Sequence, residues 1–265
     1  MLNRPQIKAD ARLLIRTAAV SPLMMSAIVL LIVFLLDRVS DLAEYGSLFY
    51  SYTYNAAYLD ALLAGNVSAL PDALPALVGD SPEIPTFFSV LVSLFTTILY
   101  GGYYAYCLGI HRGVRMPYST LLDGLSVSGK LIWCSIQMTV KIILWSLLFL
   151  FPGIIATYRY RFAYYNILSD PTMTASDAIR LSCRQTMGMK GELFLLDLSF
   201  LGWLMLPAIL SAFLGLMGLY PVVVASFLLD IWLTPYTTLC DVAYFEEARR
   251  RLAPPPPPVW NNTNY

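Results

Sequence analysis

The sequence predicts an all-α fold, a polytopic membrane bundle of six transmembrane helices with both termini in the cytoplasm. An apolar composition, long apolar runs and the distribution of basic residues between those runs predict it. Of the 265 residues, 58% are apolar and 13% are charged, and the mean hydropathy is +0.63. Soluble domains are about 45–50% apolar and about 25% charged. We therefore expect an integral membrane protein that is solvated by the lipid bilayer.

Apolar runs predict the position of each span. A helix needs about 20 mostly apolar residues to cross about 30 Å of hydrocarbon. Residues 18–36 and 87–110 meet this requirement as single spans. Pro152-Gly153 divides the next region into a span over 131–151 and a short segment over 153–168, which either crosses or lies in the interface. Residues 193–240 are too long for one crossing, and glycine and proline near their middle predict two spans, 193–213 and 219–240.

Basic residues predict the sidedness. Four cations precede the first span, whereas the loop 37–86 contains one cation and seven acids. The positive-inside rule places this loop outside and the basic groups at 112–130, 180–190 and 249–251 in the cytoplasm. The groups on either side of 131–168 share one side, so that region crosses twice or not at all. Six spans satisfy the rule, in one multi-pass domain over 1–252.

Three further segments have local signals. Residues 47–63 suit either a helix on the membrane surface or a packed cap over the bundle. Thr174-Ala175-Ser176-Asp177 has the form of a capping box that opens a short cytoplasmic helix through Ser182. Residues 253–265 begin with a proline run, and we expect a disordered tail that is either an inert spacer or a docking segment.

Composition excludes several function classes. Seventeen Lys and Arg balance seventeen Asp and Glu, so the chain lacks the basic excess of a nucleic-acid-binding protein. The single histidine and the four cysteines have no metal-ligand spacing, and we expect free thiols without a metal or cofactor. The sequence contains no nucleophile elbow, P-loop or zinc-protease motif. We therefore expect no enzyme and no catalytic residues.

Small residues recur at every fourth position of the span 87–110. The series includes Ser93, Thr97, Gly101, Ala105 and Gly109. Small side chains let two helix backbones approach closely in lipid. We expect this helix to be central and to pack either against another helix of the chain or against a second copy.

Four charged residues are predicted at membrane depth, namely Lys141, Arg159, Arg161 and Asp230. A charge at the bilayer centre costs at least about 2.5 kcal/mol, so such side chains usually face the bundle interior and pair. We expect Asp230 to neutralise Lys141 or Arg161. This charge layer is either a polar pathway for an ion, a proton or a lipid headgroup, or a structural ion pair beside a snorkelling arginine.

A series of short motifs lies between residues 152 and 245. They are Pro152-Gly153-Ile154-Ile155; Tyr164, Ile167 and Leu168 before Asp170-Pro171; Ala178-Ile179 with Ser182; Gly188-Met189-Lys190 before Leu193-Phe194; Leu198-Ser199-Phe200-Leu201-Gly202-Trp203; and Pro235-Tyr236 with Ala243-Tyr244-Phe245. In combination they resemble a bacterial family of polytopic membrane proteins, the domain of unknown function 975. That family is similar to the membrane domain of some glycerophosphodiester phosphodiesterases. The resemblance implies a helical membrane domain without an established activity.

Two of these motifs have a structural interpretation. Pro152-Gly153 is expected to turn the chain at the outer face. Gly202 beside Trp203 is expected to form a close-packing notch next to an aromatic anchor.

Two functional hypotheses follow from the sequence. The first is a non-enzymatic accessory or scaffold module that binds a membrane-protein partner or a second copy of itself. The alternative is a small transporter or lipid-handling protein that uses the charge layer.

Overall fold

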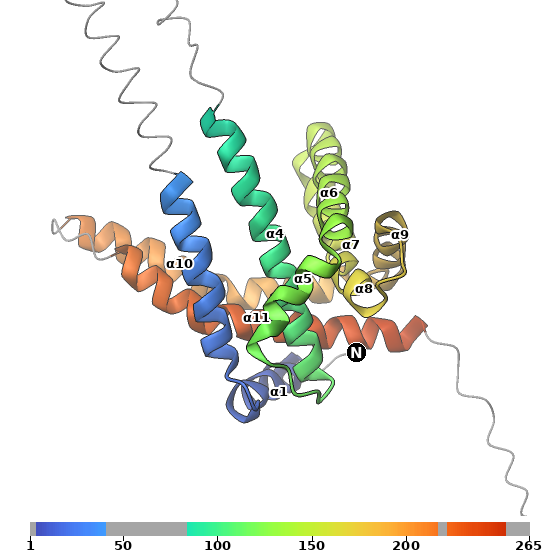
Figure 1. The fold of residues 1–265 in the computed structure, drawn as a ribbon, viewed down its shortest axis with the longest axis horizontal. Coiled ribbons are helices and arrows are strands. Elements are labelled where there is room, and N and C mark those ends of the chain that lie inside the picture. The colour runs from blue at the N-terminus through green and yellow to red at the C-terminus, as the bar shows by residue number, and fades with distance from the viewer. Residues whose placement is uncertain (1–3, 41–83, 217–221, 253–265) are drawn as a thin grey trace, which may run out of the picture.

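A computed structural model describes residues 4–40, 84–216 and 222–252, and the secondary structure in these ranges is helical (Figure 1). The all-α prediction is confirmed there. The predicted surface segment 47–63 and the proline tail lie outside the described residues. The helices are, in order, α1 (Arg4–Thr17), a helix over Pro22–Ser40, α4 (Ile84–His111), the 3₁₀ helix η2 (Tyr118–Leu122), α5 (Asp123–Ser126), α6 (Ser128–Leu148), α7 (Leu150–Tyr160), α8 (Ala163–Ser169), α9 (Ala175–Gln185), α10 (Lys190–Leu216) and α11 (Val222–Leu252).

Three of the described helices are long and apolar enough to cross a membrane. They cover Pro22–Ser40, Ser89–His111 and Ser128–Leu148. The first begins later than the predicted span 18–36, because Pro22 occupies the first helical turn, where its missing N–H needs no partner. These three helices run in similar directions, and α10 and α11 cross that direction (Figure 1).

The core is concentrated where the C-terminal halves of α4 and α11 meet. Tyr103 and Tyr106 of α4 and Tyr244 and Phe245 of α11 are fully buried there. The other half of α4 differs, since Phe95 near its start is 46% exposed. The small-residue series follows the same division. Gly101 packs against Leu131 of α6, and Gly109 packs against Met116, whereas Ser93 is exposed and Thr97 donates a hydrogen bond to the Ser93 carbonyl of its own helix.

Helices α6 and α7 form a tight hairpin, and its turn is not where the sequence predicts it. The chain reverses at Phe149, which has extended dihedral angles of φ −163° and ψ 154°. Pro152 and Gly153 instead lie in the first turn of α7, where a proline breaks no helical hydrogen bond. Gly153 is needed for the close approach of the helices, because a side chain there would collide with Ser146. The prediction of a turn at Pro152-Gly153 is therefore wrong by about one helical turn.

The short helix predicted to open at Thr174 is present as α9, and its cap is formed as expected. The Thr174 hydroxyl accepts a hydrogen bond from the Asp177 backbone N–H at 3.2 Å, and it donates to the Asp177 carboxylate at 2.6 Å. Hydrogen bonds from Thr174 and Arg180 lower the pKa of Asp177. A polar cap residue satisfies a backbone donor that the first helical turn leaves unpaired.

Replacing Thr174 by Ala is expected to destabilise α9 by about 1 kcal/mol, because the N–H of Asp177 loses its acceptor. Hydrogen–deuterium exchange of peptides that cover α9 measures the effect as faster exchange of the first helical amides. The Thr174→Ser variant keeps the hydroxyl and should exchange like the original chain. Equal exchange in the two variants would contradict a capping role.

Candidate functional site

The site begins at a break in the returning helix of the hairpin. The predicted segment 153–168 is divided between α7 and α8, and Arg161 and Phe162 form the break. The Phe162 N–H donates to the Ser182 hydroxyl at 3.1 Å, and that hydroxyl donates to the Arg159 carbonyl at 2.8 Å. A break leaves backbone groups unpaired, and these must find other partners when they are buried. Ser182 of α9 therefore holds the break in place.

The break directs Arg161 toward α10 and α11. Its guanidinium donates two hydrogen bonds to Asp197 of α10, at 2.6 and 2.8 Å, and two to Asp241 of α11, at 2.8 and 3.1 Å. The Tyr158 hydroxyl donates to the same Asp197 carboxylate at 2.9 Å. We call these four residues the Arg161 cluster. A planar guanidinium suits this arrangement because it can bind one carboxylate with two parallel hydrogen bonds and still reach a second.

The Arg161 cluster has more negative than positive groups. The side chains of Arg161 and Asp241 are 21% and 19% exposed, and that of Asp197 is 37% exposed. One guanidinium faces two carboxylates, so the cluster has a formal charge of −1 when both are ionised. Partly buried charges of this kind are costly unless each is paired and hydrogen-bonded. The cluster meets that requirement and joins the end of α7 to α10 and α11.

The other members of the predicted charge layer lie elsewhere. Lys141 has its ammonium group 5.9 Å from the centre of the Tyr160 ring. Arg159 and Asp230 form no ion pair with any residue that the structure describes, and Asp230 is exposed. The expectation that Asp230 neutralises Arg161 is wrong. Asp241 takes that place, eleven residues later on the same face of α11 and about 16 Å along its axis.

Sequence reasoning missed Asp241 because it placed the end of the last span at residue 240. Asp197 was likewise not among the four charges predicted at membrane depth. A helical-face comparison would have found Asp241, since Asp230 and Asp241 are separated by about three full turns. Which of these two aspartates reaches Arg161 depends on their depth along α11, and this depth follows from how the helices cross.

A cavity of about 270 Å³ adjoins the Arg161 cluster, and Arg161 and Asp241 form part of its wall. Most of the remaining polar lining consists of hydroxyl groups, from Tyr104, Ser135, Thr139, Thr157, Tyr160, Tyr164 and Tyr165. Hydroxyls both donate and accept hydrogen bonds, so this lining suits water or another small polar group.

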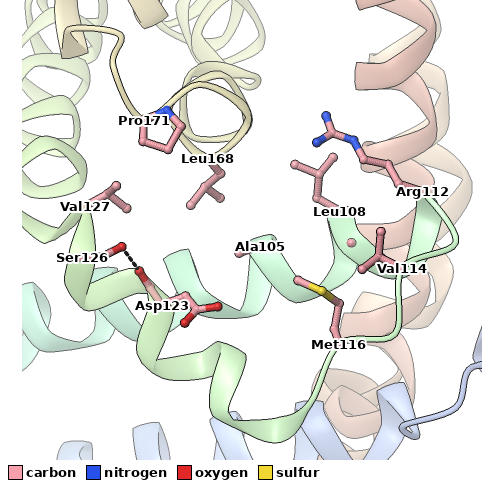
Figure 2. A pocket seen from close by; sticks show the side chains of 11 residues that line it. Ala105, Leu108, Arg112, Val114, Met116, Asp123, Ser126, Val127, Leu168 and Pro171 are labelled. Carbon is pink, nitrogen blue, oxygen red and sulfur yellow. Dashed lines mark hydrogen bonds between the residues drawn. The ribbon is translucent and has the colours of Figure 1, made fainter.

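A second pocket, of about 430 Å³, lies between the end of α4 and the segment that follows it. Its lining is largely apolar, and its charged members Arg112 and Asp123 lie on opposite sides of the opening (Figure 2). Arg112 is held by Glu246 at 2.7 Å and by Ser169 at 3.0 Å. This pocket therefore has fixed charges at its edge and little polar chemistry inside.

No group of three or more His, Cys, Asp and Glu side chains among the described residues could hold a metal ion. All four cysteines have free thiols, and Cys107, Cys134 and Cys240 are buried. The Gly202 notch is open, because no described atom lies within 4 Å of a Cβ placed there. Trp203 instead contacts Trp232, with the ring centres 5.9 Å apart.

Residues 147–252 match the family model of DUF975, a group of proteins of unknown function. This segment, which is less than half of the chain, is therefore similar to that family. The DUF975 segment contains α7 to α11 and all four residues of the Arg161 cluster. No curated protein and no solved structure matches the chain. The predicted family is thereby confirmed, and its relation to the glycerophosphodiester phosphodiesterase membrane domain stays a prediction.

Proposed function

We propose that the chain is a non-enzymatic accessory or scaffold module of the bacterial cytoplasmic membrane. It crosses the bilayer six times and keeps both termini in the cytoplasm. Membrane insertion is supported by the three long apolar helices and by the tip of the α6–α7 hairpin, where Leu147, Phe149 and Phe151 are 77%, 72% and 78% exposed. Such a tip would be unfavourable in water and suits lipid or its interface.

The observation that carries the proposed role is the pairing of Arg161 with two carboxylates. A cation that takes part in transport must exchange partners, whereas Arg161 is bound by two carboxylates from two different helices. These contacts hold α7, α10 and α11 together. They favour a structural use of the charge over a moving one, and hence a rigid module that presents its surface to a partner.

Cysteine labelling in intact cells tests the six crossings. In a background without the four native cysteines, Phe149→Cys reports the α6–α7 turn, and Gly218→Cys reports the connection between α10 and α11. Both should react with a membrane-impermeant maleimide from outside, while Arg115→Cys should react only after permeabilisation. Phe149 is a better labelling position for this turn than Gly153, because Gly153 is packed against Ser146. Labelling at 149 or 218 only after permeabilisation would contradict six crossings.

Purification in mild detergent tests the accessory role. We expect a partner membrane protein to co-purify at constant stoichiometry. It would bind in part through the tail 253–265 and in part through α9, whose Arg180 side chain is 75% exposed. Arg180→Glu with Arg184→Glu, or deletion of 253–265, should reduce the bound partner. Arg16→Glu with Arg115→Glu is the matched control, since it reverses two exposed cations elsewhere. Recovery of the chain alone, with no partner or second copy, would contradict the role.

The cavity beside the Arg161 cluster favours a second candidate, a small transporter or lipid-handling protein. Its hydroxyl lining and the negative formal charge of the cluster suit a proton or a small cation. In proteoliposomes, Asp241→Asn should then abolish a flux that Asp230→Asn leaves intact, with both variants folded. Equal flux in the two variants and the original chain would reject this candidate.

A further inference from the structure

The first helix places a row of cations in a cleft. Arg4, Lys8 and Arg12 are spaced four residues apart on one face of α1, and with Ser199 of α10 they line a cleft of about 490 Å³. The adjoining stripe of α1 is packed against the protein through Ile7 and Ala11, which are 7% and 3% exposed. The cationic side chains are therefore held at the cleft by a docked helix.

Neutral groups position two of these cations, Lys8 and Arg12. The Lys8 ammonium donates to the Ser199 hydroxyl at 2.6 Å and lies 4.4 Å from the centre of the Phe200 ring. The Arg12 guanidinium donates to the Tyr236 hydroxyl at 3.2 Å. No carboxylate in the described ranges forms an ion pair with Arg4, Lys8 or Arg12.

The cleft thus brings like charges together, and none of them is ion-paired to a carboxylate in the part of the chain that the structure describes. Burial lowers the pKa of Lys8, and the positive charges of Arg12 and Arg4 lower it further. Mutual repulsion of this kind is relieved when an anion binds between the cations. Hydroxyl and aromatic neighbours leave the ammonium and guanidinium groups with donors to spare.

The surface next to the cleft is apolar. Leu195 and Leu198 are 40% and 49% exposed, and they lie on α10 within one turn of Ser199. A ligand that is anionic at one end and apolar at the other fits this combination, because Lys and Arg near a bilayer surface attract anionic headgroups.

We propose that the cleft binds the phosphate of an anionic phospholipid, with Arg4, Lys8 and Arg12 as its ligands and the exposed face of α10 along its acyl chains. This inference rests on the proposed membrane location. The lipid would fix α1 against α10 at the membrane surface.

Lipid retention by the full chain tests the proposal. The protein is purified in mild detergent, incubated with phosphatidylglycerol or with phosphatidylcholine, and examined by native mass spectrometry. We expect selective retention of phosphatidylglycerol. Arg4→Gln should weaken it about fivefold, as expected for one cation near an anionic headgroup, and the Arg4→Gln, Lys8→Gln, Arg12→Gln variant should abolish it.

Two further variants and a folding check make the test decisive. Arg249→Gln, Arg250→Gln, Arg251→Gln removes the same number of charges from the end of α11 and should retain the lipid. Lys8→Arg keeps the charge and should also retain it. Arg4 is exposed and forms no hydrogen bond or ion pair with the described residues, so Arg4→Gln should fold like the original chain, which circular dichroism checks.

The contrary outcomes are also distinct. Equal retention of both lipids, or unchanged retention in the triple variant of α1, would overturn the proposal. Displacement of phosphatidylglycerol by millimolar inorganic phosphate would assign the cleft to a free anion instead of a lipid and would also overturn it. Carbonate extraction of cell membranes separates this failure from that of the proposed function, since the chain should stay in the membrane pellet in every variant.

Discussion

Replacing Arg161 by Gln lowers the free energy of unfolding by about 3 kcal/mol. The change leaves Asp197 and Asp241 facing each other without a cation, and removal of one partner from a buried ion pair costs about 3–5 kcal/mol. The lower end applies because the Asp197 side chain is 37% exposed. Thermal unfolding in mild detergent measures the loss through a thiol-reactive dye, which reacts with the buried Cys107, Cys134 and Cys240 only as the protein unfolds.

The matched control for this variant is Arg159→Gln. It removes the same side chain two residues earlier, where the arginine has no ion pair among the described residues, and should cost under about 1 kcal/mol. Asp241→Asn should also be mild, because it leaves one guanidinium with one carboxylate and keeps a hydrogen-bond acceptor. Equal losses in the two arginine variants would show that the Arg161 cluster does not stabilise the fold.

Replacing Gly102 by Ala lowers the free energy of unfolding by roughly 2–3 kcal/mol, because the added methyl group collides with main-chain atoms. A Cβ at this position would stand 2.6 Å from the carbonyl carbon of Leu121 and closer still to its oxygen. Gly124 makes the reciprocal contact with the Ile98 carbonyl, so α4 and the η2–α5 segment touch backbone to backbone. The same dye-based unfolding assay measures the effect.

Gly202→Ala is the matched control. Both glycines lie inside helices, and no described atom lies within 4 Å of a Cβ at Gly202. Alanine favours a helix over glycine by about 0.5–1 kcal/mol, so this variant should be neutral or slightly stabilising. If Gly102→Ala proved as stable as Gly202→Ala, the close approach of α4 to η2 would be wrong.

Signals carried by neighbouring residues predicted the local features well. The Thr174 cap of α9 follows from a few adjacent residues, and the long apolar helices follow from composition over about 20 residues. The hairpin turn was displaced because Pro152 and Gly153 signal a break, yet proline is equally compatible with the first turn of a helix. The sequence pattern could not separate these two uses of the same residue.

Structural features that depend on two elements far apart in the sequence were predicted only in part. Burial of Arg161 and its need for a carboxylate followed from its position in an apolar region. Its partners did not, since the sequence pattern favoured Asp230 over Asp241. Similarly, the small-residue series indicated a packed helix, but among the described glycines Gly102, one position outside the series, lies closest to the backbone of another element.

Composition and periodicity by themselves determined that this chain is helical, that its long helices suit a bilayer, and that Arg161 requires neutralisation. These properties depend on the side chains of one segment and on its solvent. Only the tertiary structure decided that Asp197 and Asp241 neutralise Arg161, that Ser182 holds the break beside it, and that α1 places three cations in a cleft against α10. Each of these contacts depends on the angle and depth at which separate helices cross, and the total packing of the chain decides those quantities.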